Sequence, residues 1–243
     1  MCLSIRAIAV ATALLPAAWA GAGPATSAAG HWDGAIHAPV EDIVVSVDLA
    51  ADESGKLGGT FSNPGQNLRG FPLWSATVDG EAVKLELKTG GPGVQAFDGR
   101  LSADGQTITG QFLIDVHAVP FTLKRNGEAQ IAPAPRSAAI DAKLAGSWVG
   151  SLVAGGQSLP LALTLTNHAD RTSTGTWATG GGSPTPVAIA AEDATLTLTS
   201  PIAPAVFKGT LNAQGTQISG TLTEGATQRA VVFTRVASRE TPR

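Results

Sequence analysis

The chain has 243 residues and a formal net charge of −3, and charged residues make up only 14% of the sequence. Charges of both signs are scattered along it, which is not the pattern of a protein that binds nucleic acid or an anionic membrane surface. A chain of this length is expected to form either one large β domain or two domains of about 100 residues each.

Residues 1–20 have the pattern of a secretory signal peptide. Arg6 precedes an apolar run from Ala7 to Ala18, and Ala18-Trp19-Ala20 supplies the small residues of a cleavage site. Cys2 is the only cysteine and lies ahead of that run, so the chain after Ala20 has none for a disulfide, a metal thiolate or a lipid anchor. No later segment has about 20 uninterrupted apolar residues. We therefore expect a periplasmic or secreted protein without a transmembrane segment.

The rest of the sequence contains an internal repeat, whose order and approximate spacing agree along the whole length. The matching segments are Gly30 to Gly34 with Gly146 to Gly150, Gly59 to Phe61 with Gly175 to Trp177, Phe97 to Gly105 with Phe207 to Gly215, Ile108 to Gly110 with Ile218 to Gly220, and Phe121-Thr122 with Phe233-Thr234. The repeat predicts two β domains, residues 30–125 and 146–236. Residues 126–145 are rich in proline and alanine and are predicted to be a linker.

Within each copy the apolar residues alternate with polar ones, which predicts half-buried β-strands. The residues expected to face the interior are Ile43, Val45, Val47, Leu49, Val83, Leu85 and Leu87 in the first copy, and Leu161, Leu163, Leu165, Leu196 and Leu198 in the second. Turn signals such as Asp79-Gly80, Asp104-Gly105 and Gln214-Gly215 separate the runs.

Counting the runs between turns gives about eight short strands per copy. Eight antiparallel strands can close on themselves, which removes the sheet edges and leaves an interior that either fills with side chains or holds one small ligand. The predicted fold is therefore all-β, with two tandem up-and-down β-barrels of the calycin or lipocalin kind. A β-sandwich in each copy is the alternative.

The first copy resembles a small β domain that precedes the catalytic domain in exported bacterial α/β-hydrolases and serine-hydrolase relatives. The segments that carry the resemblance are Gly30-x-Trp32-x-Gly34, Leu57 to Gln66, Phe71-Pro72-Leu73 and Val119 to Arg125. The second copy follows the same order but lacks the Ser-Asn-Pro-Gly-Gln segment. In that family the catalytic residues lie in the separate hydrolase domain, which is missing here, so the resemblance implies a non-catalytic module.

A fainter likeness links both copies to lipocalin-type barrels, in which a Gly-x-Trp on the first strand meets an arginine from the last. The likeness implies that Trp32 contacts Arg125 and that Trp148 contacts Arg235, each through a cation–π interaction.

No catalytic, cofactor-binding or metal-binding residue is assigned. The sequence has no Gly-x-Ser-x-Gly and no Ser-x-x-Lys, and its histidines, His31, His37, His117 and His168, lack metal-ligand spacing. We expect them to be exposed strand residues, although His31, His37 and Asp33 form one candidate cluster at a barrel mouth.

Three other groups of residues are candidates for function. Asp48, Asp52 and Glu53 lie near one hairpin but do not fit a calcium loop, so a solvated turn is expected. Gly180-Gly181-Gly182 lacks the lysine of a phosphate-binding loop and is expected to be a flexible hairpin. Among the tryptophans of the mature chain, Trp32, Trp74, Trp148 and Trp177, only Trp74 is favoured as functional, because Trp32 and Trp148 recur as structural plugs.

Three hypotheses for function follow. The first is a non-catalytic binding protein that holds a small apolar ligand in one or both barrels, without a cofactor. The second is an accessory module that partners a secreted hydrolase, and it predicts an exposed apolar patch. The third is an unrecognised hydrolase whose triad is not contiguous in sequence.

Overall fold

A computed structural model describes residues 28–91, 93–154 and 156–237. The predicted signal peptide, residues 1–20, lies outside these ranges. The described part is built of β-strands and one 3-10 turn, η1 (Pro64–Gln66). The strands are β1 (Gly30–His37), β2 (Asp42–Ala51), β3 (Leu57–Asn63), β4 (Leu68–Pro72), β5 (Ser75–Asp79), β6 (Ala82–Leu87), β7 (Gln95–Leu101), β8 (Thr107–Ile114), β9 (His117–Arg125), β10 (Ser137–Ala138), β11 (Gly146–Ala154), β12 (Gln157–Asn167), β13 (Thr172–Thr179), β14 (Thr185–Glu192), β15 (Thr195–Thr199), β16 (Ala205–Leu211), β17 (Gln217–Glu224) and β18 (Thr227–Arg235).

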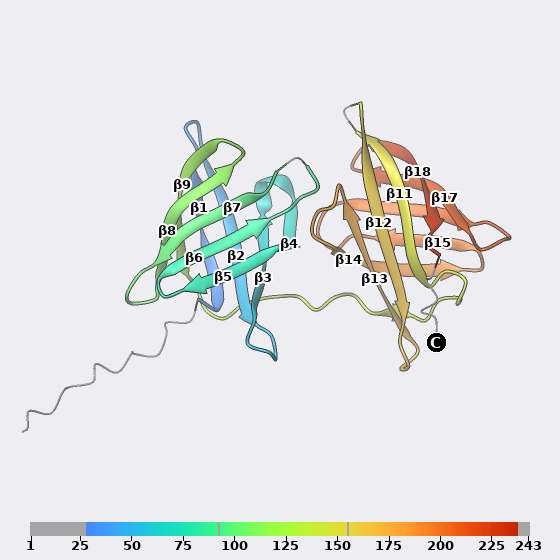
Figure 1. Cartoon of the computed structure of the whole chain (residues 1–243), viewed down its shortest axis with the longest axis horizontal. Coiled ribbons are helices and arrows are strands. Elements are labelled where there is room, and N and C mark those ends of the chain that lie inside the picture. Colours follow the sequence, from blue (N-terminus) through green and yellow to red (C-terminus); the bar gives the residue numbers. More distant parts are fainter. Residues whose placement is uncertain (1–27, 92, 155, 238–243) are drawn as a thin grey trace, which may run out of the picture.

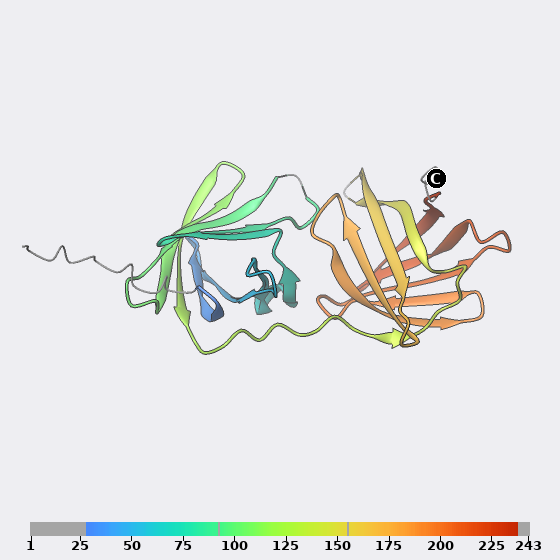
Figure 2. The same cartoon turned by 60° about the horizontal axis from the view of Figure 1, so that its bottom comes forward.

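The strands form two antiparallel sheets, one from each copy of the repeat. Their orders are β4-β3-β2-β1-β9-β8-β7-β6-β5 and β10-β13-β12-β11-β18-β17-β16-β15-β14. Each sheet curls around its own apolar core, and the two barrels lie side by side with the intervening segment running along one edge (Figures 1 and 2). The predicted all-β fold of tandem up-and-down barrels is confirmed.

The two barrels close in different ways. In the second, β13 also pairs with β14, so eight strands form a closed cylinder. In the first, β4 and β5 are the two edges, and the chain crosses between them at Leu73 and Trp74. The Leu73 N–H donates to Gly59 O at 2.9 Å, and the Trp74 N–H donates to Glu86 O at 2.7 Å. The first barrel is therefore a curled sheet whose edges are joined by this crossing.

An extra residue explains the difference. Thr60 pairs with Pro72 and Leu85 with Ala76, while the equivalent Thr176 pairs with Pro186 and Leu198 with Ile189. In the first copy the chain advances four residues from Pro72 to Ala76, whereas in the second copy it advances only three, from Pro186 to Ile189. One added residue bulges the strand, because it has no partner in the ladder. The second copy therefore has one strand, β14, where the first copy has two, β4 and β5.

The predicted interior positions are buried, with one exception. Val45, Val47 and Leu49, the three residues from β6 and the five leucines from β12 and β15 are all buried. Ile43, at the start of β2, is 38% exposed, so that assignment is wrong. Asp48 has an outward position but is buried, because His31 and the segment after β9 cover it.

One predicted match between the copies is also wrong. The sequence aligns Phe121-Thr122 with Phe233-Thr234, yet Trp32 pairs with Arg125 and Trp148 with Arg235. The strand register therefore aligns Phe121 with Val231, two residues away from the sequence match. Phenylalanine occurs on the inward face of both closing strands at different heights, and this made the incorrect match look plausible.

The predicted tryptophan–arginine contacts are confirmed and close one end of each barrel. The guanidinium of Arg125 lies 4.3 Å from the ring centroid of Trp32, and that of Arg235 lies 4.2 Å from Trp148. Both tryptophans are fully buried. Each indole N–H donates to a backbone oxygen four residues earlier, Ala28 O at 2.9 Å or Leu144 O at 3.0 Å.

The arginines also bind the chain around that end. Arg235 Nε donates to Gly215 O at 2.8 Å, its terminal nitrogens donate to Ala145 O at 2.8 Å and to Lys143 O, and Arg125 Nε donates to Gly105 O at 2.8 Å. One charged side chain thus satisfies the carbonyls of two separate loops, which is why this end is closed. We call the opposite end of each barrel its mouth.

The segment between the barrels is held at both ends. After β9, the His31 N–H donates to Gly127 O at 2.9 Å, and the Gln130 N–H donates to Asp48 Oδ1 at 2.7 Å. Near the second copy, β10 pairs with β13, and Leu144 is fully buried in the second core. Residues 126–145 are predicted as a linker, and within the described ranges much of this segment is attached to one barrel or the other.

The two barrels dock mouth to mouth through equivalent elements. The Arg69 N–H donates to Ile202 O at 2.8 Å, and the Ser183 N–H donates to Lys88 O at 2.7 Å. Arg69 and Ser183 are equivalent positions. Arg69 lies three residues before Pro72, which pairs with Thr60 of β3, and Ser183 lies three residues before Pro186, which pairs with the equivalent Thr176 of β13. Ile202, from the β15–β16 loop, is buried in the core of the first barrel. The docking therefore has approximate two-fold symmetry.

The glycines of the β13–β14 turn explain this close approach. Gly180 has a φ of +60°, and a Cβ there would lie 1.9 Å from Gly90 O. A Cβ on Gly182 would lie 2.5 Å from Lys88 O. The Gly180-Gly181-Gly182 run, predicted as a flexible hairpin, is thus the surface on which the β6–β7 loop of the first barrel packs.

The tryptophan–arginine contact that closes each barrel, called the plug below, gives one prediction. Arg235→Met is expected to destabilise the protein by about 2–3 kcal/mol in urea unfolding, because it removes a buried cation–π contact and leaves three carbonyls without this donor. Arg136→Met, which removes an exposed ion pair with Asp170, is expected to cost under about 1 kcal/mol. Equal losses in the two variants would argue against the plug.

The docking surface gives a second prediction. Gly180→Ala is expected to separate the barrels and raise the radius of gyration in small-angle X-ray scattering. The control is Gly225→Ala, whose φ of +57° is similar but whose Cβ would meet nothing within 4 Å. Both variants pay the left-handed backbone penalty of about 1 kcal/mol, and only the first obstructs the other barrel. An unchanged radius for Gly180→Ala would contradict the docking.

Candidate functional site

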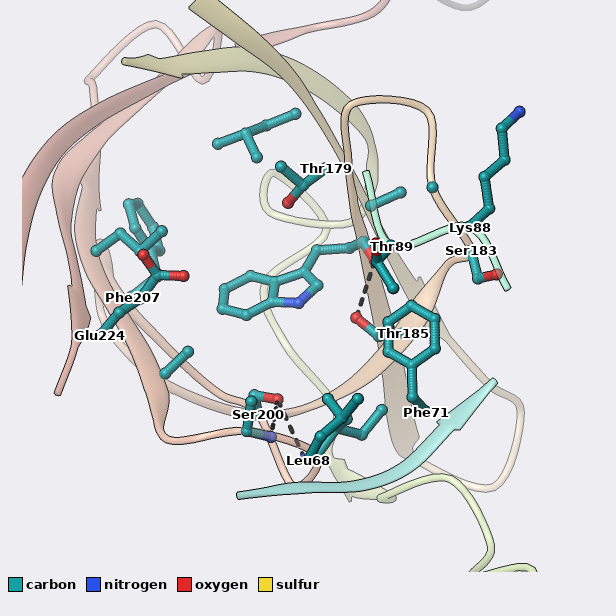
Figure 3. Close-up of a pocket in the computed structure, with 18 of the residues that line it drawn as sticks. Leu68, Phe71, Lys88, Thr89, Thr179, Ser183, Thr185, Ser200, Phe207 and Glu224 are labelled. Carbon is teal, nitrogen blue, oxygen red and sulfur yellow. Dashed lines mark hydrogen bonds between the residues drawn. The ribbon is translucent and has the colours of Figure 1, made fainter. Parts of the chain in front are cut away.

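The candidate site is a cavity of about 210 Å³ at the mouth of the second barrel, where the first barrel covers it. Its apolar wall comes mainly from Leu161, Trp177, Phe207, Leu222 and Phe233. Leu68, Phe71, Lys88 and Thr89 of the first barrel complete the lining (Figure 3). The site is therefore shared between the two copies of the repeat.

The interior of the first barrel is filled by phenylalanine. Phe97 lies at its centre, with ring centroid distances of 5.8 Å to Phe61, 4.5 Å to Phe112 and 5.0 Å to Phe121. All four rings are buried. Such clusters of tilted and edge-to-face aromatic rings pack tightly.

The second barrel has fewer rings at the equivalent positions, because Leu222 and Val231 stand where the first has Phe112 and Phe121, while Phe233 stands where the first has Leu123. Phe207 and Phe233 form a single edge-to-face pair with centroids 5.3 Å apart. Phe97 pairs with Phe112 in the first barrel, while the equivalent Phe207 pairs with Leu222. A leucine in place of a phenylalanine removes interior volume, and the cavity lies where that volume is missing.

Trp177 takes the place of Phe61 and lies at the cavity wall. Phe61 is buried in the first core, whereas Trp177 is only half-buried. Its carbonyl accepts the Thr185 hydroxyl at 3.2 Å, which ties β13 to β14 beside the cavity. From the sequence, Trp177 is one of the large aromatic residues and has no assignment to a site. The signal in the sequence was that Trp177 corresponds to Phe61 in the repeat, and that Leu222 corresponds to Phe112.

The charges at the cavity are unevenly placed. Lys88 lines the cavity, but its side chain is directed away from the other labelled residues, with its ammonium 4.4 Å from the ring centroid of Trp74 (Figure 3). Glu224, at the end of β17, extends towards the cavity and is bound to Arg229. A carboxylate therefore faces the cavity, while the nearby lysine charge does not.

Trp74, the tryptophan favoured from the sequence, does not line the cavity. It is 48% exposed at the bulge of the first barrel, where it stacks on Lys88. Its contribution to the site is thus indirect, through the position of Lys88.

The candidate cluster of His31, His37 and Asp33 does not form as expected. His31 and His37 stand at opposite ends of β1. His31 is beside the plugged end, with Nδ1 2.7 Å from Asp48 Oδ1 and Nε2 3.1 Å from Asp33 Oδ1. Burial by itself lowers the pKa of His31, but the hydrogen bond and charge of Asp48, with help from Asp33, more than offset this and raise the pKa.

The acidic residues near the β2–β3 hairpin do not gather around a common point. Asp52 accepts the Ser54 hydroxyl at 2.6 Å and the backbone N–H groups of Ser54 and Lys56. These bonds, that of the Ser54 hydroxyl first, lower the pKa of Asp52. The arrangement is a solvated turn, and Asp48 points instead to His31.

His37 takes part in a chain of groups in the order found in hydrolase triads. Its Nδ1 lies 3.1 Å from the Asp42 carboxylate and its Nε2 lies 3.2 Å from the Thr122 hydroxyl. His37 and Asp42 are 43% and 57% exposed and face each other across β1 and β2 on the outer face of the sheet. They do not line the cavity. An exposed, hydrogen-bonded cross-strand pair accounts for this geometry.

Comparison with known proteins identifies no relative in sequence: no family model matches, and no curated protein matches. Solved structures of remote similarity include a Bacteroides fragilis protein provisionally assigned to the outer membrane, with 13% identity, 87% of this chain and 99% of that chain covered, and a TM-score of 0.27. A DUF3598-family protein of unknown function from Nostoc punctiforme has 13% identity, coverage of 86% and 96%, and a TM-score of 0.27. Isotype 1 transferrin binding protein B from serogroup B Neisseria meningitidis has 11% identity, coverage of 81% and 53%, and a TM-score of 0.25.

Neither a metal-ion cluster nor a membrane-spanning helix is present among the described residues. No group of three or more His, Cys, Asp and Glu side chains within these ranges is arranged to hold a metal ion. No helix in this part of the chain has the length and hydropathy needed to cross a membrane.

The contact of His31 with Asp48 and Asp33 gives a prediction for pH dependence. Because the pKa of His31 is raised in the folded state, its stabilisation is present below the unfolded value of about 6.5 and is lost as the pH rises through the folded value. Between about pH 5.5 and pH 8.5 we expect a loss of about 1 kcal/mol in urea unfolding. His31→Gln is expected to remove this loss, and the matched variant His37→Gln to retain it. A pH profile unchanged by His31→Gln would refute the assignment.

Proposed function

We propose that this protein binds a small, largely apolar ligand in the cavity of its second barrel and acts by binding, without catalysis. The observation that carries the proposal is the difference between the two interiors. One copy of the repeat fills its barrel with four phenylalanines, and the other leaves a lined cavity at the equivalent place. An empty apolar volume costs stability, so the retention of this cavity in the second barrel favours a use for it.

The size of the cavity limits the ligand. It has about 210 Å³, which exceeds the roughly 150 Å³ that holds benzene and is below the roughly 300–1,000 Å³ of pockets for drug-sized molecules. A single ring with a short substituent, or a short acyl chain, fits this range. Apolar side chains from β12, β13, β16, β17 and β18 would supply most of the contact area.

The proposal includes export, as a periplasmic or secreted protein. Its support is the sequence from Arg6 to Ala20, which lies outside the described residues. An exported binding protein of this kind is also in keeping with the resemblance of the first copy to the non-catalytic β domains of secreted hydrolases.

A role as an accessory module for another protein has a weaker basis. Its expected feature is an exposed apolar patch, and Val149, Val153 and Val232 are 50%, 64% and 44% exposed on the outer face of β11 and β18. The cavity is the more specific feature, because it is shaped by both barrels.

The function is tested by filling the cavity. Leu222→Phe places in the second barrel the residue that the first has at Phe112, and is expected to reduce the affinity for ethylbenzene at least tenfold while the protein stays folded. The control Val206→Phe adds a ring on the outer face, where Val206 is 38% exposed, and should bind ethylbenzene normally. Calorimetric titration measures both affinities.

Native mass spectrometry of protein purified from its export compartment complements the titration. A retained adduct that leaves on denaturation, and that is absent from the Leu222→Phe protein, is the expected result. Failure of the wild-type protein to bind ethylbenzene or to retain any adduct would overturn the proposed function.

A further inference from the structure

Glu224 brings a negative charge to the cavity. Among the described residues that line the cavity, only Lys88 and Glu224 are charged. The Lys88 side chain is directed away, with its ammonium over the ring of Trp74, whereas the Glu224 side chain extends towards the cavity (Figure 3). The full charge that a ligand meets in this cavity is therefore that of a carboxylate.

One oxygen of this carboxylate is left for a ligand. Arg229 Nη1 binds Oε2 of Glu224, and within the described residues the carboxylate makes no other hydrogen bond or ion pair. Arg229 itself does not line the cavity. The ion pair thus holds the carboxylate at the mouth of the second barrel, while Oε1 can accept a further donor.

The first copy of the repeat has no charge at this place. The strand register that aligns Phe112 with Leu222 also aligns Ile114 with Glu224. Across the hairpin, Phe112 pairs with Val119 and Leu222 pairs with Arg229. The barrel that is filled with phenylalanine therefore has isoleucine and valine where the barrel with the cavity has an ion pair. This difference connects the ion pair with the cavity, because both copies share the hairpin itself.

Two hydroxyls of the wall can act with Glu224 as acceptors. Thr89 and Thr179 line the cavity, and neither hydroxyl makes a hydrogen bond within the described ranges. The other hydroxyls of the wall are not available in this way. Ser200 accepts two backbone N–H groups, Thr185 donates to a backbone oxygen, and the enclosed Ser183 hydroxyl is directed away (Figure 3). A ligand group that only donates hydrogen bonds suits this set of acceptors.

The aromatic part of the wall suits the same group. An aromatic ring carries a negative face, which attracts a cation as well as packing against apolar atoms. The aromatic side chains that line the cavity are Phe71, Trp177, Phe207 and Phe233.

We propose that the ligand is a primary or secondary amine with an apolar body, and that its ammonium group binds the Glu224 carboxylate while the body lies against the aromatic wall. This ligand class rests on the proposed function, because it refers to the same cavity. An aliphatic amine is protonated at neutral pH, as lysine is. The Glu224 side chain is 48% exposed, so an ammonium group beside it keeps part of its hydration and avoids most of the cost of burying a charge.

The test compares three probes that share a phenyl ring and differ in the charge of the end group: 2-phenylethylamine, 2-phenylethanol and phenylacetate. At pH 7 and low ionic strength, wild-type protein is expected to bind the amine about fivefold more tightly than the alcohol, which is near the upper limit for an exposed ion pair. Phenylacetate is expected to bind more weakly than the alcohol. Calorimetric titration gives the affinities, and added salt should reduce the preference for the amine.

Variants then assign the preference to one carboxylate. Glu224→Gln keeps the shape of the side chain and is expected to abolish the fivefold preference, with the affinity for 2-phenylethanol unchanged. The control Glu192→Gln removes an exposed carboxylate at the end of β14, away from the cavity wall, and should behave as wild type.

Three results would overturn the inference: equal binding of amine and alcohol to the wild-type protein, a preference that persists in Glu224→Gln, or a preference lost equally in Glu192→Gln. Failure of every probe, ethylbenzene included, would instead reject the proposed function. The two failures are therefore distinguishable.

Discussion

The contact between a buried tryptophan and an arginine decides which end of each barrel is open. A small β-barrel has two ends, and without a plug both would expose apolar interior to water. Trp32 with Arg125 and Trp148 with Arg235 close the same end in both copies, and each arginine satisfies loop carbonyls there. Only the mouths are left uncovered, and each barrel covers the mouth of the other. The docking, the shared cavity and the position of Ser183 all depend on this closure.

The two barrels differ inside far more than their shared strand order suggests. Phe112 in one copy and Leu222 in the other occupy equivalent positions, as do Phe61 and Trp177. The first set completes a phenylalanine cluster, and the second leaves room. Close packing makes such exchanges consequential, because neighbouring side chains relax only partly into a missing volume.

Much of the fold follows from the sequence alone. Alternating apolar residues such as Val45, Val47 and Leu49 identify the inward face, and the repeat identifies two barrels. The tryptophan–arginine contacts were also predictable, from the likeness to lipocalin-type barrels, in which a Gly-x-Trp on the first strand meets an arginine from the last. The incorrect match of Phe121 with Phe233 shows the limit: inward phenylalanines two residues apart look alike in sequence, and only strand register separates them.

The site was much less predictable. Its walls come from both copies, and no local pattern states that the mouths face each other. The Gly180-Gly181-Gly182 run suggests a flexible hairpin when the chain is considered one domain at a time. In the structure, side chains are excluded at Gly180 and Gly182 because the backbone of Lys88 and Gly90 packs against them. Trp74 attracted attention because it has no counterpart. The absence of a ring at Leu222 was the better indication, but it becomes visible only when the two interiors are compared position by position.

Covalent linkage gives the paired barrels a freedom that a dimer of identical subunits lacks. In a symmetric homodimer every substitution appears on both sides of the axis, so enlarging one interior enlarges the other and any charge at the seam faces its own copy. Here Arg69 and Ser183 occupy the matching places of one chain and can differ. One half can therefore specialise as a rigid cover and the other as a container, while segment 126–145 keeps the two at high effective concentration. The approximate two-fold symmetry brings the two mouths together, and the differences between the two copies leave the cavity at the mouth of the second barrel.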